Sequence, residues 1–349
     1  MKNFIRRREF IKTTAAGGIG LGLTSRLFPK SGENDTQSGR VGIIGLDTSH
    51  STAFTKALND PDSGPEFGGF KIVAAYPRGS NDIKSSVDRI PAYTEQVMKL
   101  GVEIVNSIDE LLGKVDFVLL ETNDGRLHLE QALQVMKAGK SMFIDKPIAA
   151  SLSDTIAIFK AASHYNVPLF SSSSLRYITG VKEIAEGSIG KVTGAYTYSP
   201  ATLELTHPDL FWYGVHGVEI LFTVMGTGCK NVVRSYSDNT DVVTAIWQDD
   251  RIGTYRGIRS GKSDYGGIVY GEKGISVLGK YSGYNPLLNE IIKFFQTGTP
   301  PVTAEETTEI FAFMEAADKS KQRGGSIVEI EEVMKKATKE ANQIISKII

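Results

Sequence analysis

A short segment, residues 41–50, has the residue types and spacing from which a nucleotide-binding turn is built. In the pattern Gly-x-Gly-x-x-Gly the first glycine makes the turn, the second admits a pyrophosphate, and the third allows close packing of helix on strand. Gly45 occupies the first position, whereas Asp47 and His50 occupy the second and third. On its own, this motif fits a modified nucleotide site and a purely structural turn equally well.

Asp47 is the main obstacle to ordinary nucleotide binding. A carboxylate beside a pyrophosphate adds like-charge repulsion at a helix N-terminus that otherwise favours anions. Thr48, Ser49 and Ser51 supply hydroxyl donors at the same turn. Alternatively, Asp47 can cap the following helix by accepting hydrogen bonds from its first backbone N–H groups.

The next predicted strand ends in Ala-Ala-Tyr-Pro-Arg-Gly, residues 74–79, and lacks the acidic residue that binds an adenosine ribose. Pro77 stands near that place, and Arg78 beside it can pair with a 2′-phosphate. This favours NADP over NAD as a cofactor. A solvated arginine in a turn is an equal alternative.

The elements that must position these residues alternate along the first half of the chain. Apolar runs at residues 41–45, 72–76, 117–121, 142–144 and 167–170 predict strands, and helical spacing predicts helices at residues 51–59, 127–138 and 154–165. Ser151 and Asp154 form a capping box for the last of these helices. Continuous β-branched strands between helices predict an α/β, doubly wound, parallel Rossmann sheet.

After residue 176 the pattern changes to runs rich in Tyr, Thr, Val and Gly, at residues 192–198, 232–237, 241–247, 253–258 and 267–270. These predict antiparallel strands, with helices at residues 208–225, 285–296, 304–319 and 330–348. We therefore expect a Rossmann domain over residues 38–175 and an α+β substrate and oligomerisation domain over residues 176–349. The second domain should contain an open, largely antiparallel sheet.

Two later segments carry a family resemblance. Residues 117–123 end in Glu-Thr-Asn with His128 soon after, and residues 138–147 read Ala-Gly-Lys-Ser-Met-Phe-Ile-Asp-Lys-Pro. They resemble the Gfo/Idh/MocA oxidoreductase family, which includes glucose-fructose oxidoreductase and has a strand ending in Thr-Pro-Asn and another closing in Glu-Lys-Pro. The resemblance continues through residues 175–177, 207–226 and 300–302.

The resemblance implies an oxidoreductase with NADP or NAD. In the family the lysine of Glu-Lys-Pro lies beside the nicotinamide and a later histidine acts as acid or base, which gives Lys146 and His216 as the catalytic pair. A hydride leaves a carbinol carbon only as the hydroxyl proton is taken, so a base must be within hydrogen-bond reach. The residues expected to bind the cofactor are Gly45, Asp47, Thr48, Ser49, Arg78, Thr122, Asn123, His128, Asp145, Lys146 and Pro147.

The chain departs from the family where an Asp should stand four residues before the histidine, because that position is Trp212. Glu219, one turn beyond His216, is a candidate for the missing carboxylate. Trp212 and Tyr213 can stack on a sugar ring, although Trp212 can equally fill a domain interface. The residues expected to meet the substrate are Arg176, Tyr177, Trp212, Tyr213 and Glu219.

Composition limits the partners. The chain has 39 basic and 40 acidic residues, and residues 1–30 hold seven basic and one acidic of them, which leaves 32 against 39 and a net charge of −7. Such a balance lacks the basic footprint of a nucleic-acid-binding protein. Cys229 stands alone, and five scattered histidines without paired spacing carry no metal signature.

The N-terminus reads Arg-Arg-Glu-Phe-Ile-Lys before a weakly apolar, glycine-rich stretch to residue 28. This predicts a twin-arginine signal over residues 1–30 and a periplasmic protein, with no membrane span in the mature form. The alternative is a basic N-terminus that happens to contain Arg-Arg.

Two functions follow. The first is an oxidoreductase that acts on a sugar, polyol or glycoside hydroxyl with a tightly held cofactor. The second is a carbohydrate-binding or regulatory relative that kept the fold and lost redox chemistry. In either case the open sheet predicts a homodimer or homotetramer, because a wide apolar face on a monomer is unusual.

Overall fold

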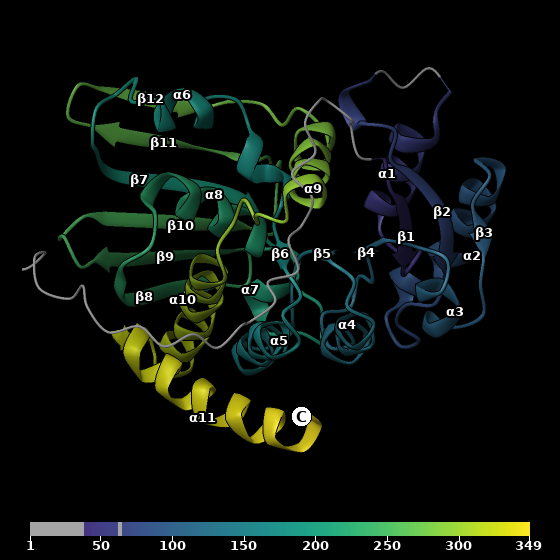
Figure 1. Cartoon of the computed structure of the whole chain (residues 1–349). Coiled ribbons are helices and arrows are strands. Elements are labelled where there is room, and N and C mark those ends of the chain that lie inside the picture. Colours follow the sequence, from purple (N-terminus) through teal and green to yellow (C-terminus); the bar gives the residue numbers. More distant parts are fainter. Residues whose placement is uncertain (1–37, 62–64) are drawn as a thin grey trace, which may run out of the picture. The chain divides into compact units, whose positions relative to one another are not determined.

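The computed structural model describes residues 38–61 and 65–349, and the export signal expected over residues 1–30 lies outside them. Two β-sheets organise this part of the chain (Figure 1). Within it, no helix combines the length and the apolar character needed to cross a lipid bilayer.

The first sheet has six parallel strands in the order β3-β2-β1-β4-β5-β6. This is the strand order of a doubly wound Rossmann fold, in which ligands bind beyond the carboxyl ends of the strands near the β1–β4 switch point. The predicted fold class is confirmed. The strands are β1 (Arg40–Ile44), β2 (Lys71–Tyr76), β3 (Glu103–Ile104), β4 (Phe117–Leu120), β5 (Met142–Ile144) and β6 (Leu169–Ser171).

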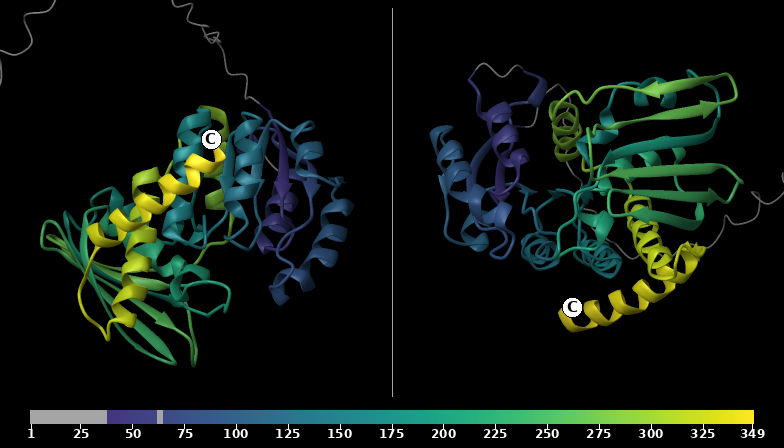
Figure 2. Two further views of the ribbon diagram at one scale, coloured as in Figure 1. Left: turned by 90° about the horizontal axis from the view of Figure 1, so that it is seen from below. Right: turned by 180° about the vertical axis from the view of Figure 1, so that it is seen from behind.

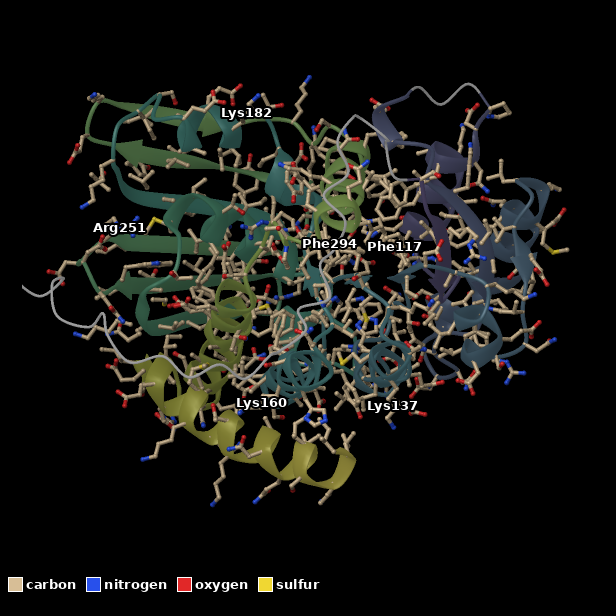
Figure 3. The ribbon with its side chains drawn as sticks, in the orientation of Figure 1. Phe117, Lys137, Lys160, Lys182, Arg251 and Phe294 are labelled. Carbon is tan, nitrogen blue, oxygen red and sulfur yellow. The ribbon has the colours of Figure 1, made fainter. Side chains whose placement is uncertain are left out.

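Both faces of this sheet are buried, which explains its continuous apolar strands. Val41 and Ile43 of β1 enter one core with α1 (Ser49–Asn59), α2 (Lys84–Lys99) and α9 (Asn285–Thr297), whereas Ile44 enters the other. The other core includes α3 (Ile108–Leu112), α4 (His128–Lys137) and α5 (Leu152–Tyr165). Figure 3 shows Phe117 of β4 and Phe294 of α9 in the first of these cores.

Because α9 follows residue 176 in the chain yet packs on the first sheet, the chain order and the spatial grouping differ here. The domain boundary between residues 175 and 176 stays a prediction. Half of the predicted capping box of α5 is confirmed, since the Ser151 hydroxyl accepts a hydrogen bond from the Asp154 N–H at 3.0 Å. The other half differs, because the Asp154 carboxylate accepts a hydrogen bond from the Ser151 hydroxyl and not from the Ser151 N–H.

The second sheet has seven strands in the order β12-β11-β7-β10-β9-β8-β13. Its pairings are antiparallel except that between β7 and β10, so the sheet is mixed and largely antiparallel, as expected. The strands are β7 (Val192–Pro200), β8 (Cys229–Ser237), β9 (Thr240–Trp247), β10 (Ile252–Ile258), β11 (Gly266–Gly271), β12 (Gly274–Leu278) and β13 (Val328–Glu329).

Helices cover one face of the second sheet. α8 (Val215–Met225) packs on β7 and β10, and α10 (Ala304–Gln322) packs on β8. Figure 2 shows the C-terminal helices, yellow, on one side of the green strands. The other face exposes apolar side chains, among them Ile246 and its cross-strand partner Ile252. The remaining helices are α6 (Val181–Ala185), α7 (Asp209–Trp212) and α11 (Ile330–Ile348), and two short 3₁₀ turns span Pro65–Phe67 and Ser174–Tyr177.

Candidate functional site

A cavity of about 490 Å³ opens where the strands of the first sheet end. Segments that follow β1, β4 and β5 form one side of it, with Thr48, Ser49, His50, Asn123, Asp145 and Lys146. Later segments complete the lining, with Trp212, Tyr213, His216, Tyr265, Tyr281 and Tyr284. The cavity therefore lies where a doubly wound fold binds its ligands.

The turn after β1 is built around Gly45 and Asp47. Gly45 has a φ of +91°, and a Cβ there would lie 2.5 Å from the Thr122 nitrogen, so only glycine fits. The Asp47 carboxylate is fully buried and accepts a hydrogen bond from the Asn123 N–H at 3.0 Å. It also lies against Gly79, where a Cβ would come 2.0 Å from Asp47 Oδ2. Burial raises the pKa of the Asp47 carboxyl, and the Asn123 N–H opposes this.

The idea that Asp47 caps α1 is wrong. Thr48 is the N-cap residue, and no side chain accepts a hydrogen bond there. Asp47 points instead beneath the turn, toward the ends of β2 and β4, because it bonds to Asn123 and touches Gly79. The cavity side of the turn thus keeps the backbone N–H groups of the first turn of α1, beside Thr48 and Ser49.

Arg89 and Ser85 of α2 line the same end of the cavity. The Arg89 guanidinium donates a hydrogen bond to the Asp47 backbone oxygen at 3.4 Å, which holds it over the turn. The sequence motif missed both residues, because α2 was not predicted. Arg78, which was expected to meet a 2′-phosphate, is exposed at the end of β2 and does not line the cavity.

His50, Glu121 and Asp145 form a buried cluster on the floor of the cavity. His50 Nδ1 lies 2.9 Å from Asp145 Oδ1 and 3.7 Å from Glu121 Oε2. Burial and the Asp145 charge raise the pKa of the Glu121 carboxyl well above its usual value. Burial acts in the same direction on Asp145, but His50 and Lys146 outweigh it and lower the pKa of that carboxyl to about 2. Spacing in the sequence does not reveal this cluster.

Lys146 and His216 line the same cavity, one from the end of β5 and the other from α8. His216 is 5% exposed, and burial together with the nearby Lys146 charge holds the pKa of its imidazole well below the usual value. His216 Nδ1 lies 2.6 Å from the Ser173 hydroxyl, which also accepts a hydrogen bond from the Leu175 N–H. The ring nitrogen left for a ligand is therefore Nε2.

Glu219 does not partner His216, which corrects that expectation. Its carboxylate accepts a hydrogen bond from Arg176 Nη1 at 3.0 Å, and Arg176 also binds Glu306 of α10. All three lie away from the cavity, and so does Tyr177. Burial, opposed by Arg176, raises the pKa of the Glu219 carboxyl to about 7. Arg176 and Glu219 thus join the segment after β6 to α8 rather than contacting a ligand.

Trp212 and Tyr213 do line the cavity, at the break between α7 and α8. Three tyrosines that no motif indicated line it as well. The Tyr265 hydroxyl lies 3.3 Å from that of Tyr213, and the Tyr284 hydroxyl lies 2.9 Å from Ser49 Oγ. Tyr281 stands between them, with ring centroids 6.4 Å from Tyr265 and 5.8 Å from Tyr284. The cavity wall is therefore aromatic and rich in hydroxyl groups.

Several predicted site residues support the walls without facing the cavity. His128 is fully buried, with its ring nitrogens 2.6 Å from the Thr122 oxygen and 3.1 Å from the Ile148 oxygen. Burial lowers the pKa of this imidazole, and the two backbone oxygens oppose that effect. The ring connects the end of β4 to the segment after β5. Thr122 and Pro147 are buried beside these contacts.

The fold and this cavity define a Rossmann-type domain followed by a mixed-sheet domain that closes over the strand ends. Residues 39–173 match the model of the Gfo/Idh/MocA family, described as an oxidoreductase family with an NAD-binding Rossmann fold. The match supports the family resemblance over the first domain.

Two curated relatives show the same likeness. The chain is 35% identical over 100 residues to 1,5-anhydro-D-fructose reductase of Ensifer adhaerens, which covers 27% of this chain and 30% of that protein. It is 30% identical over 159 residues to inositol 2-dehydrogenase 3 of Saccharopolyspora erythraea, covering 43% and 42%. The matched segments thus span less than half of the length of these relatives.

Among solved structures, the chain is similar to scyllo-inositol dehydrogenase of Lactobacillus casei, determined with NAD(H) and scyllo-inositol. The TM-score is 0.67 at 15% identity, over 84% of this chain and all of that one. At this identity the likeness shows that the two proteins share both domains of the fold.

Proposed function

We propose that this protein is an NAD(P)-dependent oxidoreductase that acts on a hydroxyl group of a sugar, polyol or glycoside. The observation that carries the proposal is the meeting of Lys146 and His216 in one cavity that reaches the N-terminus of α1. The match of residues 39–173 to an NAD-binding family supports it independently.

The residues around α1 fit the phosphates of such a cofactor. The objection raised by Asp47 is reduced, because its carboxylate is buried beneath the turn and does not line the cavity. The cavity side offers uncapped helix N–H groups, the Ser49 and Ser85 side chains and the Arg89 guanidinium. These groups suit a diphosphate, since helix N-termini and arginines both favour anions. The nicotinamide, when bound, exchanges a hydride with the substrate carbon.

The remaining roles belong to the chain's own side chains. His216 is held neutral by burial and by Lys146, so its free nitrogen can take the hydroxyl proton as the carbinol is oxidised. Lys146 can donate to the same oxygen and stabilise the charge that develops on it. Ser173 holds the imidazole through Nδ1.

The cavity wall supports a carbohydrate or polyol as the substrate. Rings of Trp212 and Tyr213 offer apolar faces, and the Tyr265 and Tyr281 hydroxyls offer donors and acceptors. Burial raises the pKa of both tyrosines, which therefore remain neutral donors. A polyhydroxylated ring needs this combination of stacking faces and hydroxyl partners.

The test begins with the intact chain purified after export. The protein is denatured and the supernatant is assayed for nicotinamide nucleotide, which we expect at close to one equivalent. The folded protein is then assayed with inositols and 1,5-anhydro-D-fructose, the compounds named for its relatives, against His216→Gln and Lys146→Met. Absence of nucleotide, together with no binding of added NAD(P)H, would refute the proposal.

One observation favours a second function, a carbohydrate-binding protein without redox chemistry. Asp47 places a carboxyl group beneath the turn that would hold the phosphates, and Glu121 and Asp145 place two more against His50, all of them fully buried. This alternative predicts a rise in melting temperature with a sugar or polyol, and none with NAD, NADH, NADP or NADPH. Bound nucleotide in the purified protein would exclude it.

Two further expectations belong to this proposal. The twin-arginine pattern supports export of a folded protein that has already bound its cofactor, and a signal-reporter fusion of residues 1–30 with Arg7→Lys and Arg8→Lys as control tests it. The exposed apolar face of the second sheet supports a homodimer or homotetramer. Sedimentation of the wild type against Ile246→Lys tests that.

A further inference from the structure

We infer that His50, Glu121 and Asp145 form a binding site for one divalent transition-metal ion on the floor of the cavity. The three side chains come from the start of α1 and from the ends of β4 and β5. The inference rests on these residues alone and holds whether or not a nucleotide binds.

The geometry of the three ligand atoms suits a single ion. One atom of each side chain lies within 4.8 Å of the other two, with His50 Nδ1 at 2.9 Å from Asp145 Oδ1 and 3.7 Å from Glu121 Oε2. Ligands of a tetrahedral ion at about 2.1 Å lie roughly 3.4 Å apart. The observed separations lie on either side of that value, so small rotations of the side chains would close the site.

Unpartnered oxygen atoms point to a missing ligand. Glu121 Oε1 and Asp145 Oδ2 are both buried without a hydrogen-bond partner among the described residues, and both side chains are completely buried. A buried carboxylate oxygen without a partner carries a large desolvation cost. Thr48 donates to the other Glu121 oxygen at only 3.4 Å, which does little to offset it.

The local charge also favours a cation. Two carboxylates face one imidazole, and a third, Asp47, lies nearby beneath the same turn. Two cationic side chains line the cavity nearby, Lys146 beside the cluster and Arg89 at the Asp47 backbone oxygen. Among the described residues, neither forms an ion pair with these carboxyl groups. A divalent ion would balance the cluster and at the same time complete the hydrogen-bonding needs of the two carboxylates.

One imidazole nitrogen with two carboxylate oxygens selects the kind of ion. Imidazole favours ions such as Zn²⁺ and Fe²⁺, and carboxylates are also accepted by Mn²⁺. Mg²⁺ prefers oxygen ligands alone and keeps its water, so it should bind more weakly. His50 and Asp145 line the cavity, which gives the ion a path of entry. Its open coordination positions would therefore face that cavity and take a ligand oxygen.

The experiment uses the full chain, without an affinity tag that binds metals. Chelator-treated protein is titrated with Zn²⁺ and with Mn²⁺ by calorimetry, and the metal content of untreated protein is measured by mass spectrometry. Glu121→Gln keeps the shape of the cluster and removes a charge, and His50→Phe suits the neighbouring rings of Phe54 and Tyr284. The control is His164→Asn, a change at an exposed histidine outside the cluster.

We expect one equivalent of ion per chain, with binding weakened about 100-fold or more in Glu121→Gln and His50→Phe and unchanged in His164→Asn. Electron spin-echo spectra of the Mn²⁺ form should show one imidazole nitrogen, which disappears in His50→Phe. If the variants do not fold, anomalous scattering at the zinc edge from wild-type crystals decides by its position. Binding of well under one equivalent, or full binding by Glu121→Gln, would overturn the inference.

Discussion

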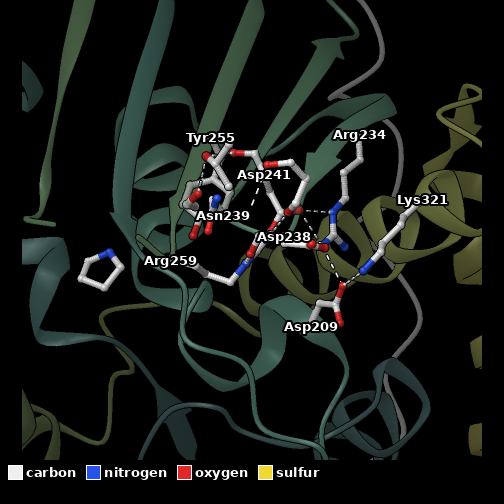
Figure 4. A network of polar contacts seen from close by, with 12 residues as sticks. Asp209, Arg234, Asp238, Asn239, Asp241, Tyr255, Arg259 and Lys321 are labelled. Carbon is white, nitrogen blue, oxygen red and sulfur yellow. Dashed lines mark hydrogen bonds and ion pairs between the residues drawn. The ribbon is translucent and has the colours of Figure 1, made fainter. Parts of the chain in front are cut away.

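Replacing Arg234 with methionine should test how the segment that carries Trp212 and His216 is held. Arg234 is fully buried on β8 and donates hydrogen bonds to Asp241 at 3.0 and 2.9 Å, to Asp209 at 2.7 Å and to Asp318 (Figure 4). Asp209 is the first residue of α7, three residues before Trp212. The arginine therefore connects the second sheet to the wall of the cavity.

The expected loss of unfolding free energy depends on which cationic partner each carboxylate still has in the variant. Without Arg234, Asp241 still binds Arg259 and Asp209 still binds Lys321, but Asp318 loses its cation. Breaking a buried ion pair by removing one partner costs about 3–5 kcal/mol. We expect Arg234→Met to lose that much unfolding free energy at pH 8. The control Lys321→Met removes a cation that is one-third exposed and should lose less than about 1 kcal/mol.

The pH dependence of the stability difference between Arg234→Met and the wild type provides an independent test. Burial, opposed by Arg234, raises the pKa of the Asp318 carboxyl to about 7, and the loss of Arg234 raises it further. When the pKa of a carboxyl group is higher in the folded than in the unfolded protein, the group destabilises the folded state as the pH rises. The loss develops between the pKa in the unfolded protein and the pKa in the folded protein. The difference between Arg234→Met and the wild type should therefore shrink as the pH falls from 8 to 5.

Urea unfolding followed by circular dichroism at pH 5, 6.5 and 8 measures both effects. The variant should also weaken binding of any ligand that touches Trp212. A loss no larger than that of Lys321→Met, with the same difference at all three pH values, would refute the assignment of Arg234 as the anchor.

Three other changes test the site and its supports. Glu219→Gln should lose about 3–5 kcal/mol of unfolding free energy in urea, because Arg176 then keeps only Glu306 as an ion-pair partner. The control Glu306→Gln should lose less, because the Glu306 side chain is more exposed than that of Glu219. NMR titration should show the His216 imidazole neutral from pH 8 to below pH 6.5, and Lys146→Met should raise the pKa of this imidazole. A titration midpoint at or above pH 6.5 in the wild type would contradict the burial argument. Ser173→Ala should lower kcat about tenfold with little change in KM, because Ser173 contacts the His216 imidazole and does not line the cavity. Ser173→Thr should recover activity. An equal effect of Ser172→Ala would count against this role of Ser173.

Elements with a strong periodic pattern could be predicted from the sequence. α11 has the predicted bounds, and its apolar side chains recur at helical spacing along nineteen residues. β5 also begins and ends as expected, because a short apolar run lies between Lys140 and Asp145. In both cases burial along the element determines the residue types, so the bounds of the element can be predicted from the local apolar pattern.

Elements without an apolar stripe were missed. α2 buries only two of its sixteen residues, Ser86 and Val97, and has Pro91 inside it, so neither periodicity nor propensity marks it as a helix. Because α2 was not predicted, Arg89 was not predicted as a site residue either. The predicted single helix over residues 208–225 is two helices, which end and begin around Tyr213 and Gly214.

Partners of the site residues could not be predicted from spacing on one element. Glu219 lies one turn from His216, and helical spacing alone puts the two on one face. Arg176 and Ser173 come from another segment and take one side chain each, which only the packing of that segment against α8 decides. Tyr265, Tyr281 and Tyr284 reach the cavity from loops and strand ends, where no periodic pattern identifies them.

The changed residues in the phosphate turn make physical sense only as a set. A histidine at position 50 brings a ring between α1 and the strand ends, where it meets Asp145 and Glu121. Without that ring the two buried carboxylates would repel each other, and without them the ring would lose its partners. Asp47 likewise depends on Gly79 for space and on Asn123 for its hydrogen bond. Random loss of a nucleotide site would not supply such matched partners, which argues that the turn has been rebuilt for a ligand.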